Sequence, residues 1–357
     1  MVASELKLKG AEAVEFDPTK AKLISKRRRI TLPQWATAWI VLLPALVFIC
    51  MFMLYPIINT FLYAFMQNFN TAANAGNFAL GQFVAAIQFD PILEVTPSAN
   101  GAFGFDNFRL ALTDPNFLAS IGNTAILTIV EVPLTIIIAL LIATFLNSIK
   151  VLRGFFQTIF FLPYVTNTIA LGLVFNIAFS STQGGLVNML LMNVFGVKEP
   201  IEWLTYNASK FSQGVVIVLY AIWNGLAFKI LVFMAGLATI DKQYSDAAKI
   251  DGANHFTIWR RITLPLLSPQ ILYITITSFI GSFKMYTGVM AVYQQSSGGQ
   301  GYYFGGHDEW IPVVGWIYKN LDISRPGRAS AASLILLAII MVITAVQFMV
   351  SKKRVHY

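Results

Sequence analysis

The sequence has 357 residues, of which 56% are apolar and 12% are charged, against a charged share of roughly 25% in soluble domains. This composition argues against a soluble protein and predicts an integral membrane protein. The net charge of +8 does not indicate nucleic-acid binding, because the charged residues separate long neutral stretches and do not line one face. Cys50 is the only cysteine, which excludes a disulfide framework and a cysteine zinc site.

Six apolar intervals follow one another along the chain, each able to supply the roughly 20 residues with which a helix crosses a membrane. Three of these intervals contain no charge, and the other three contain one each, at Glu131, Lys229 and Lys284. Barrel strands would instead alternate between polar and apolar residues in segments of about ten. The sequence therefore predicts an all-α protein with six transmembrane helices. Their expected ranges are 36–64, 118–146, 155–180, 212–239, 266–292 and 329–350.

The first apolar stretch follows a basic N-terminus, but it is too long for a signal-peptide core and is expected to remain as an anchor. Lys and Arg then gather in alternate loops, as they do on the cytoplasmic side of membrane proteins. The basic segments are 26–29, 150–153, 242–261 and 352–354. Both termini are therefore expected in the cytoplasm.

The loop between the fourth and fifth predicted spans, Asp241 to Pro265, is neither a span nor an ordinary turn. Apolar residues from Ile240 to Ala248 recur at helical spacing, which predicts a short amphipathic helix. Gly252 can then adopt a backbone angle that other residues resist, and a second short helix would run up to Pro265. The expected product is a helix–turn–helix elbow. On these features alone, a helix lying on anionic lipid and a docking device are both open.

The spacing of residues in this elbow closely resembles the EAA loop of binding-protein-dependent ABC transporter permeases. The matching positions are Asp246, Ala247, Ala248, Gly252, Ala253, Ile262, Leu264 and Pro265. The resemblance extends over residues 36–350 and is to the sugar-permease, maltose-type branch of the family. Outside the loop it is carried by Gly104–Phe108, Asp114, Phe117, Asn123–Thr124, Arg153–Pro163, Gly185, Asn188, Tyr318 and Gly327–Ala331.

The resemblance implies the transmembrane domain of a type I ABC importer, which is a transport subunit and not an enzyme. Such a subunit moves a sugar or an oligosaccharide into the cell. In this family the elbow docks into a groove of a cytoplasmic ATPase, where Asp246 would accept a charged hydrogen bond from a basic residue. The family usually has Glu at that position, and Asp is one methylene shorter.

ATP must be handled by a partner, because the chain contains no Gly-Lys dipeptide and therefore no Walker A phosphate loop. The resemblance implies that ATP and Mg are bound by the ATPase and that this chain binds no cofactor. The expected partners are a second homologous permease subunit, a dimer of the cytoplasmic ATPase, an extracytoplasmic sugar-binding protein and membrane lipid. The expected location is the cytoplasmic membrane of a bacterium or archaeon.

Five parts are expected along the chain in this interpretation. They are a cytoplasmic tail over 1–35, a first transmembrane helix over 36–66, an external loop over 67–117 with an insertion at 71–102, a permease core over 118–350 with the coupling loop at 241–265, and a basic cytoplasmic tail over 351–357. The insertion is expected to be a surface loop, a kind of segment that tolerates added residues.

In the maltose-type branch, the spans that flank the EAA loop hold the sugar midway across the membrane. The corresponding positions here form two helical faces with the spacing i, i+3, i+4, i+7. They are Ala221, Asn224, Gly225 and Phe228 in the fourth span and Ser278, Gly281, Ser282 and Met285 in the fifth. Amide and hydroxyl groups beside an apolar surface suit a sugar, but small residues and Ser are equally apt for helix packing.

Glu131, Lys229 and Lys284 fall inside predicted spans, where a charge costs about 2.5–3.5 kcal/mol and is usually paired or faces a cavity. They are therefore added to the candidate substrate path. Glu131 could neutralise one Lys, whereas an unpaired Lys would favour an anionic solute such as an acidic sugar or glycerol phosphate. Glu131 could also drive an ion-coupled secondary transporter, but that class has more spans and a pseudo-repeat.

The three histidines are too far apart in the sequence to form a local metal motif, and no nucleophile with a base is recognisable. No catalytic or metal-ligating residue is assigned.

Overall fold

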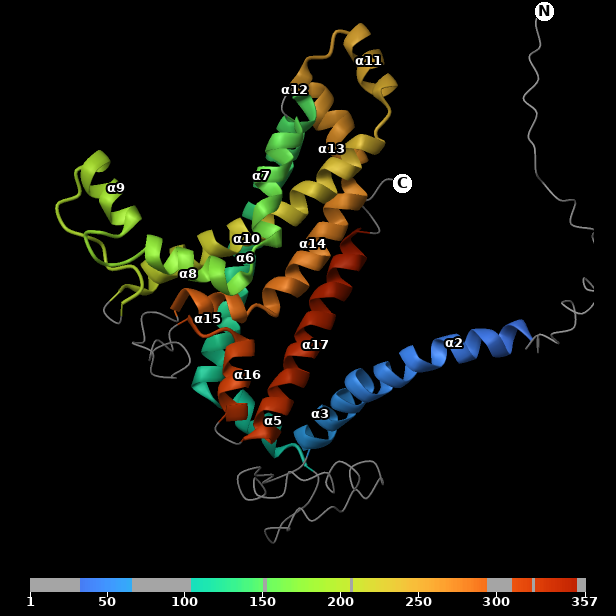
Figure 1. Cartoon of the computed structure of the whole chain (residues 1–357), viewed down its shortest axis with the longest axis vertical. Coiled ribbons are helices and arrows are strands. Elements are labelled where there is room, and N and C mark those ends of the chain that lie inside the picture. The colour runs from blue at the N-terminus through green and yellow to red at the C-terminus, as the bar shows by residue number, and fades with distance from the viewer. Residues whose placement is uncertain are drawn as a thin grey trace, which may run out of the picture. The chain divides into compact units, whose positions relative to one another are not determined.

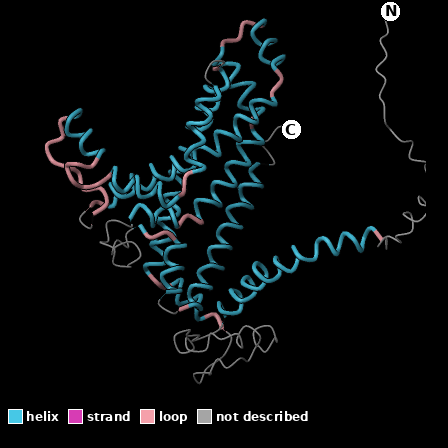
Figure 2. Tube along the Cα trace, viewed as in Figure 1, coloured by secondary structure: helices cyan, strands magenta, loops and turns pink. Residues whose placement is uncertain are grey.

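The computed structural model describes residues 33–65, 104–149, 153–205, 208–293, 310–322 and 325–351. These residues form helices and connecting loops, and none of them forms a strand (Figure 2). The predicted insertion at 71–102 lies outside the described residues, as do nearly all of the two predicted cytoplasmic tails. The chain falls into two compact units that divide between Ile57 and Ile58.

The first apolar stretch is helical without a break. It consists of α2 (Gln34–Ile49), η1 (Cys50–Leu54) and α3 (Tyr55–Phe65). η1 is one turn of π-helix, closed by the backbone N–H of Tyr55, which donates to the carbonyl of Cys50. Residues Trp35–Phe65 are long and apolar enough to cross a membrane, and nearly all the described side chains of the first unit are exposed within it. A helix that is apolar on every side is stable when lipid or protein surrounds it.

α6 (Pro115–Ser148) and α10 (Lys210–Thr239) lie at the centre of the second unit and pack against each other more extensively than any other two described helices (Figure 1). Both begin at a polar cap that satisfies a free backbone donor. The caps are Asp114, which accepts a backbone N–H at 2.8 Å, and Ser209, which accepts one at 3.1 Å. Together with α17 (Pro326–Ser351), these helices are the predicted second, fourth and sixth spans.

The predicted third span is a broken helix. It consists of α7 (Arg153–Val165) and α8 (Thr168–Ala178), which meet at 98°. Asn167 lies at the break, and its side chain accepts the backbone N–H of Ile169 at 2.8 Å, which starts a new helix in a new direction. Hydropathy reports only length and apolarity, so this bend was not predicted from it.

The predicted fifth span is broken as well. The helical segment His255–Leu266 meets α14 (Ser268–Phe283) at 64°, and α14 ends well before residue 292. The chain continues in a separate helix, α15 (Thr287–Tyr293). Counting each bent pair as one span gives the six spans predicted, although the third and fifth are not the single continuous helices expected.

Asn107 joins three helices at the end of the unit where α17 begins. α5 (Asp106–Leu112) carries Asn107, whose Nδ2 donates to the Ala64 carbonyl near the end of α3 at 3.2 Å. Gly327 packs against the same amide, because a Cβ added at Gly327 would lie 2.7 Å from Asn107 Nδ2. Two motifs far apart in the sequence, Gly104–Phe108 and Gly327–Ala331, therefore form one packing contact.

Asn188 organises the loop between α8 and α10. It lies near the start of α9 (Leu186–Phe195) and is almost fully buried. Its amide donates to the carbonyl of Ser180 at 3.1 Å, and its Oδ1 accepts from the indole Nε1 of Trp203 at 3.0 Å. A buried amide with its donors and acceptors satisfied fixes one loop conformation. α16 (Val313–Asp322) packs against α6 and α17.

Candidate functional site

The predicted elbow is present, and local hydrogen bonds shape it. α11 (Lys242–Ile250) begins at Asp241, whose carboxylate accepts a backbone N–H at 3.0 Å. The helix ends at Gly252, whose φ of +78° lies in the left-handed region that favours glycine. The N–H of Gly252 donates to the Lys249 carbonyl at 3.0 Å, and the next N–H donates to the Ala248 carbonyl at 2.9 Å. This pair is a Schellman motif, so the turn predicted at Gly252 is confirmed.

The second arm of the elbow is fastened to the transmembrane helices. It consists of α12 (His255–Ile258), η3 (Trp259–Thr263) and α13 (Leu264–Leu266). The indole Nε1 of Trp259 donates to Thr144 Oγ1 of α6 at 3.2 Å. The Trp259 ring packs against the buried apolar cluster that α6, α10 and α14 share. Figure 1 shows the elbow at one end of α7, α10 and α14.

The first arm is exposed. Asp246, Ala247 and Ile250 all lie on the surface, and 88% of Ile250 is exposed. Asp246 Oδ1 accepts from Lys249 Nζ at 2.9 Å, and this hydrogen bond, with the charge of the ammonium, holds the pKa of Asp246 below its ordinary value. Asp246 is therefore a carboxylate at neutral pH. Of the other predicted loop residues, Gly252 is exposed and the half-buried ones are Ala248, Ala253, Ile262, Leu264 and Pro265.

A cavity of about 610 Å³ lies between α6, α10 and α14, beside the bend that joins α7 to α8. Ten of the eleven residues that the sequence placed on a substrate path line it. They are Glu131, Ala221, Asn224, Gly225, Phe228, Lys229, Ser278, Gly281, Ser282 and Met285. The eleventh, Lys284, is exposed and does not line the cavity. The two helical faces that the resemblance implied thus line one cavity.

The remaining lining residues were not singled out from the sequence. They are Tyr164, Thr166, Thr168, Tyr220, Thr277, Tyr286, Thr287 and Gly288. Three of them flank the break between α7 and α8, and the Tyr164 ring stacks on Phe228 with 6.0 Å between centroids. The position of these three residues depends on the 98° bend between α7 and α8, and the periodicity of apolar residues does not predict such a bend.

Comparison with known families gives the identity of the chain. Residues 132–356 match the family described as the binding-protein-dependent transport system inner membrane component, which is more than half of the sequence. The chain belongs to this permease family. It is therefore a transport subunit of an ABC importer in the inner membrane, and not an enzyme.

The permease is similar in sequence to permeases of other transport systems. The permease is 29% identical over 302 residues to the arabinooligosaccharides transport system permease protein AraP of Bacillus subtilis, with 84% of this chain and 83% of AraP covered. It is 28% identical over 319 residues to the lactose transport system permease protein LacF of Rhizobium radiobacter, with 88% and 94% covered. It is 30% identical over 257 residues to the sn-glycerol-3-phosphate transport system permease protein UgpA of Brucella abortus, with 70% and 81% covered.

A solved structure has the same fold as the permease. It is a bacterial ABC transporter involved in the import of the acidic polysaccharide alginate, with a TM-score of 0.64 and 20% identity. The likeness covers 89% of this chain and 95% of that one. The predicted transmembrane domain of a type I ABC importer is thereby confirmed.

Two polar interactions between helices hold the cavity wall of the permease. Lys229 Nζ of α10 lies 3.5 Å from Glu131 Oε1 of α6. The hydroxyls of Thr128 on α6 and Ser282 on α14 lie 2.9 Å apart, which is hydrogen-bond distance. Of the arrangements that the sequence left open for the buried charges, the structure has the internal ion pair, and its cation is Lys229.

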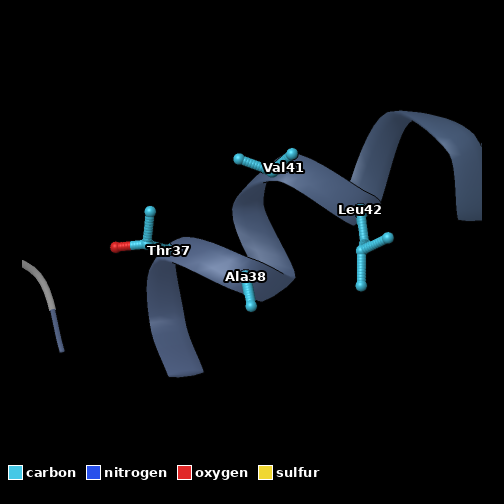
Figure 3. A pocket seen from close by; sticks show the side chains of 4 residues that line it. All are labelled: Thr37, Ala38, Val41 and Leu42. Atoms are coloured by element: carbon cyan, nitrogen blue, oxygen red, sulfur yellow. The ribbon is translucent and has the colours of Figure 1, made fainter. Parts of the chain in front are cut away.

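A shallow depression also lies on α2 of the permease. Figure 3 shows its four lining side chains, Thr37, Ala38, Val41 and Leu42, projecting from one helix. All four lining residues come from α2, so no other described element covers the depression.

Within the described part of the chain, no three His, Cys, Asp or Glu residues gather in a way that could hold a metal ion.

Proposed function

We propose that this permease pairs with a second homologous subunit and moves a sugar or an oligosaccharide into the cell through the cavity between α6, α10 and α14. The observation that carries the proposal is the lining of this cavity, which sets the amide of Asn224 and the hydroxyls of Thr277 and Ser278 near the stacked rings of Tyr164 and Phe228. A sugar needs hydrogen bonds for its hydroxyls and apolar contact for its ring faces, and ligand sites in proteins combine these two features.

The names of the relatives support a carbohydrate substrate. AraP is named for arabinooligosaccharides and LacF for lactose. UgpA is named for sn-glycerol-3-phosphate, which makes a phosphorylated polyol the second candidate substrate.

The elbow is, in this proposal, the docking element for a cytoplasmic ATPase dimer. Asp246 offers an exposed carboxylate to a basic residue of the ATPase, and Ala247 and Ala248 allow close approach of the two backbones. Gly252 sets the angle between the arms, and the half-buried residues of the second arm hold it against the membrane helices. ATP and Mg²⁺ would be bound by the ATPase, because this sequence contains no Gly-Lys dipeptide.

The direction of the chain in the membrane follows from this docking. An elbow that binds a cytoplasmic ATPase must face the cytoplasm, which places both termini there and the loop at 67–117 outside. The proposed organisation is therefore a tail over 1–35, a first span over 36–66, the external loop, a core over 118–350 and a basic tail over 351–357. A solved alginate transporter was captured with its oligosaccharide-bound periplasmic protein, and we propose that a sugar-binding protein delivers the substrate to the outer side of this permease.

The test uses the complete importer, with both permeases, the ATPase and the binding protein, in proteoliposomes. ATP hydrolysis should rise with the transported sugar, and the sugar should accumulate only with ATP. Asn224→Leu should lower uptake about tenfold, because a polar contact to the sugar is lost. Leu219→Met, at an exposed site on the same helix, should leave uptake unchanged. Uptake driven by an ion gradient without ATP, or purification in detergent without an ATPase, would overturn the proposal.

A further inference from the structure

The pair formed by Glu131 and Lys229 is a part of the cavity that sugar transport alone does not explain. Lys229 Nζ lies 3.5 Å from Glu131 Oε1, and only 7% and 6% of the two side chains are exposed. Both residues nevertheless line the cavity. Charges buried at membrane depth are rare, and they are retained where they are paired or act on a solute.

Gly225 has no side chain, and the Lys229 ammonium group occupies the space beside it in the cavity wall. Lys229 lies one helical turn after Gly225 on α10, and its side chain folds back along the helix, the direction in which helical side chains point. A Cβ added at Gly225 would lie 2.7 Å from Lys229 Nζ and 3.5 Å from Glu131 Oε1. Thr135 Oγ1 donates to the same Glu131 oxygen at 3.1 Å. The ion pair is thus built into the wall by neighbours on both helices.

The charges of the cavity wall cancel. Among the described residues that line the cavity, only Glu131 and Lys229 carry a formal charge. Lys284, the other cation of the predicted spans, is exposed and lies outside the lining. A carboxylate or phosphate in the cavity would meet hydroxyls, an amide and aromatic rings, and the one cation of this described lining already faces Glu131.

We infer that this ion pair makes the permease selective for uncharged sugars over anionic ones, and that Glu131 is the residue that sets the preference. The inference rests on the proposed function and names the charge class of its substrate. An anion that approached Lys229 would also approach the Glu131 carboxylate, and like charges repel strongly where water is scarce. A neutral sugar can use the outer N–H groups of Lys229 and the free lone pairs of Glu131 as donors and acceptors.

The test measures equilibrium binding to the detergent-solubilised importer without its binding protein, so that the membrane cavity does the selecting. The probes are digalacturonate and the galactobiose isomer with the same glycosidic linkage, which differ only in the carboxylates. The wild-type importer should bind galactobiose more tightly. Glu131→Gln should shift the ratio of the two dissociation constants toward digalacturonate by about tenfold or more, because an unpaired cation attracts the anion.

Two further variants separate selectivity from folding. The double variant Glu131→Gln with Lys229→Met restores a neutral wall and should return the ratio toward the wild-type value. Lys284→Met removes a cation outside the lining and should leave the ratio unchanged. A purely structural role for the pair would lower the melting temperature of Glu131→Gln, and the yield of complex with the ATPase, without moving the ratio.

Two results would overturn the inference. One is tighter binding of digalacturonate than of galactobiose by the wild type, and the other is an unchanged ratio in an assembled Glu131→Gln importer. Both leave the proposed function intact if ATP-driven sugar uptake is observed. Failure of that uptake, with no binding of either probe, removes the proposed function and the inference together.

Discussion

The elbow and the cavity hold functional residues in different ways. The first arm of the elbow and its turn are shaped by hydrogen bonds between residues at most five positions apart, such as the bond from the Ala253 N–H to the Ala248 carbonyl. The cavity is shaped by contacts between distant residues, such as Thr128 and Ser282, which are 154 positions apart. An exposed, locally ordered segment can change without loosening the fold, whereas a cavity wall is part of the packing. Substitutions should therefore alter coupling in the elbow and both stability and transport in the cavity.

The largest effect is expected from Gly225→Val. The new side chain would displace Lys229 from Glu131, and separating a buried ion pair costs about 3–5 kcal/mol. Thermal unfolding in detergent should show this loss, and sugar uptake should disappear. Gly281→Val is the matched control, because Gly281 lines the same cavity but no heavy atom lies within 4 Å of an added Cβ. Equal stability loss in both variants would contradict this account of the wall.

Gly252→Val should distort the turn of the elbow and have little effect on the rest of the fold. A left-handed backbone costs a non-glycine residue about 1–2 kcal/mol, enough to reduce sugar-stimulated ATP hydrolysis about tenfold. Gly196→Val is the control, since Gly196 also has a positive φ, +69°, and open space around it, but it ends α9. Normal sugar-stimulated ATP hydrolysis in Gly252→Val would show that the shape of the elbow does not matter for transport.

Trp259→Phe tests the link between the two regions. It keeps an aromatic ring against the apolar cluster and removes the N–H that donates to Thr144. A hydrogen bond of this kind is worth about 1 kcal/mol, so stimulated ATP hydrolysis should fall about fivefold. Trp39→Phe, at an exposed position in the first unit, should have no effect. If both variants behave alike, the bond to Thr144 does not transmit movement.

The smallest effect concerns the charge of Asp246. Lys249 lowers its pKa, so the carboxylate and its contribution are present above the ordinary pKa and are lost only as the pH falls through the lowered value. The ratio of coupled ATPase rates between wild type and Asp246→Asn should therefore stay constant from about pH 6 to pH 8. Asp246→Glu, which restores the residue usual in the family, should match or exceed the wild type. A ratio that collapses toward one at pH 6 would mean that Asp246 is already protonated there.

Residue type and local spacing predicted the elbow, and the resemblance to the maltose-type branch, applied along two helical faces, predicted most of the cavity lining. Gly252 and Asp241 act on their own backbone, so their roles follow from residue type and position. Lys284 was added to the substrate path because a charge inside a predicted span is expected to be paired or to face a cavity. The predicted span over 266–292 is broken, however, and Lys284 lies exposed at the end of α14. Tyr164 was missed because a bend at Asn167 brings it to the cavity. The bond from Asn107 to the end of α3 depends on packing that no single segment encodes.

The hydrogen bond from Trp259 to α6 has a consequence for how the two ends of the permease communicate. Thr144, which accepts it, lies thirteen residues after Glu131 on one uninterrupted helix, a separation of about 20 Å at 1.5 Å per residue. Thermodynamic linkage is reciprocal. If the docked ATPase changes the affinity of the cavity for sugar through this helix, a bound sugar must change the affinity of the elbow for the ATPase by the same factor. Occupancy of the cavity would then be an allosteric signal that reaches the nucleotide-binding subunit before any sugar has crossed.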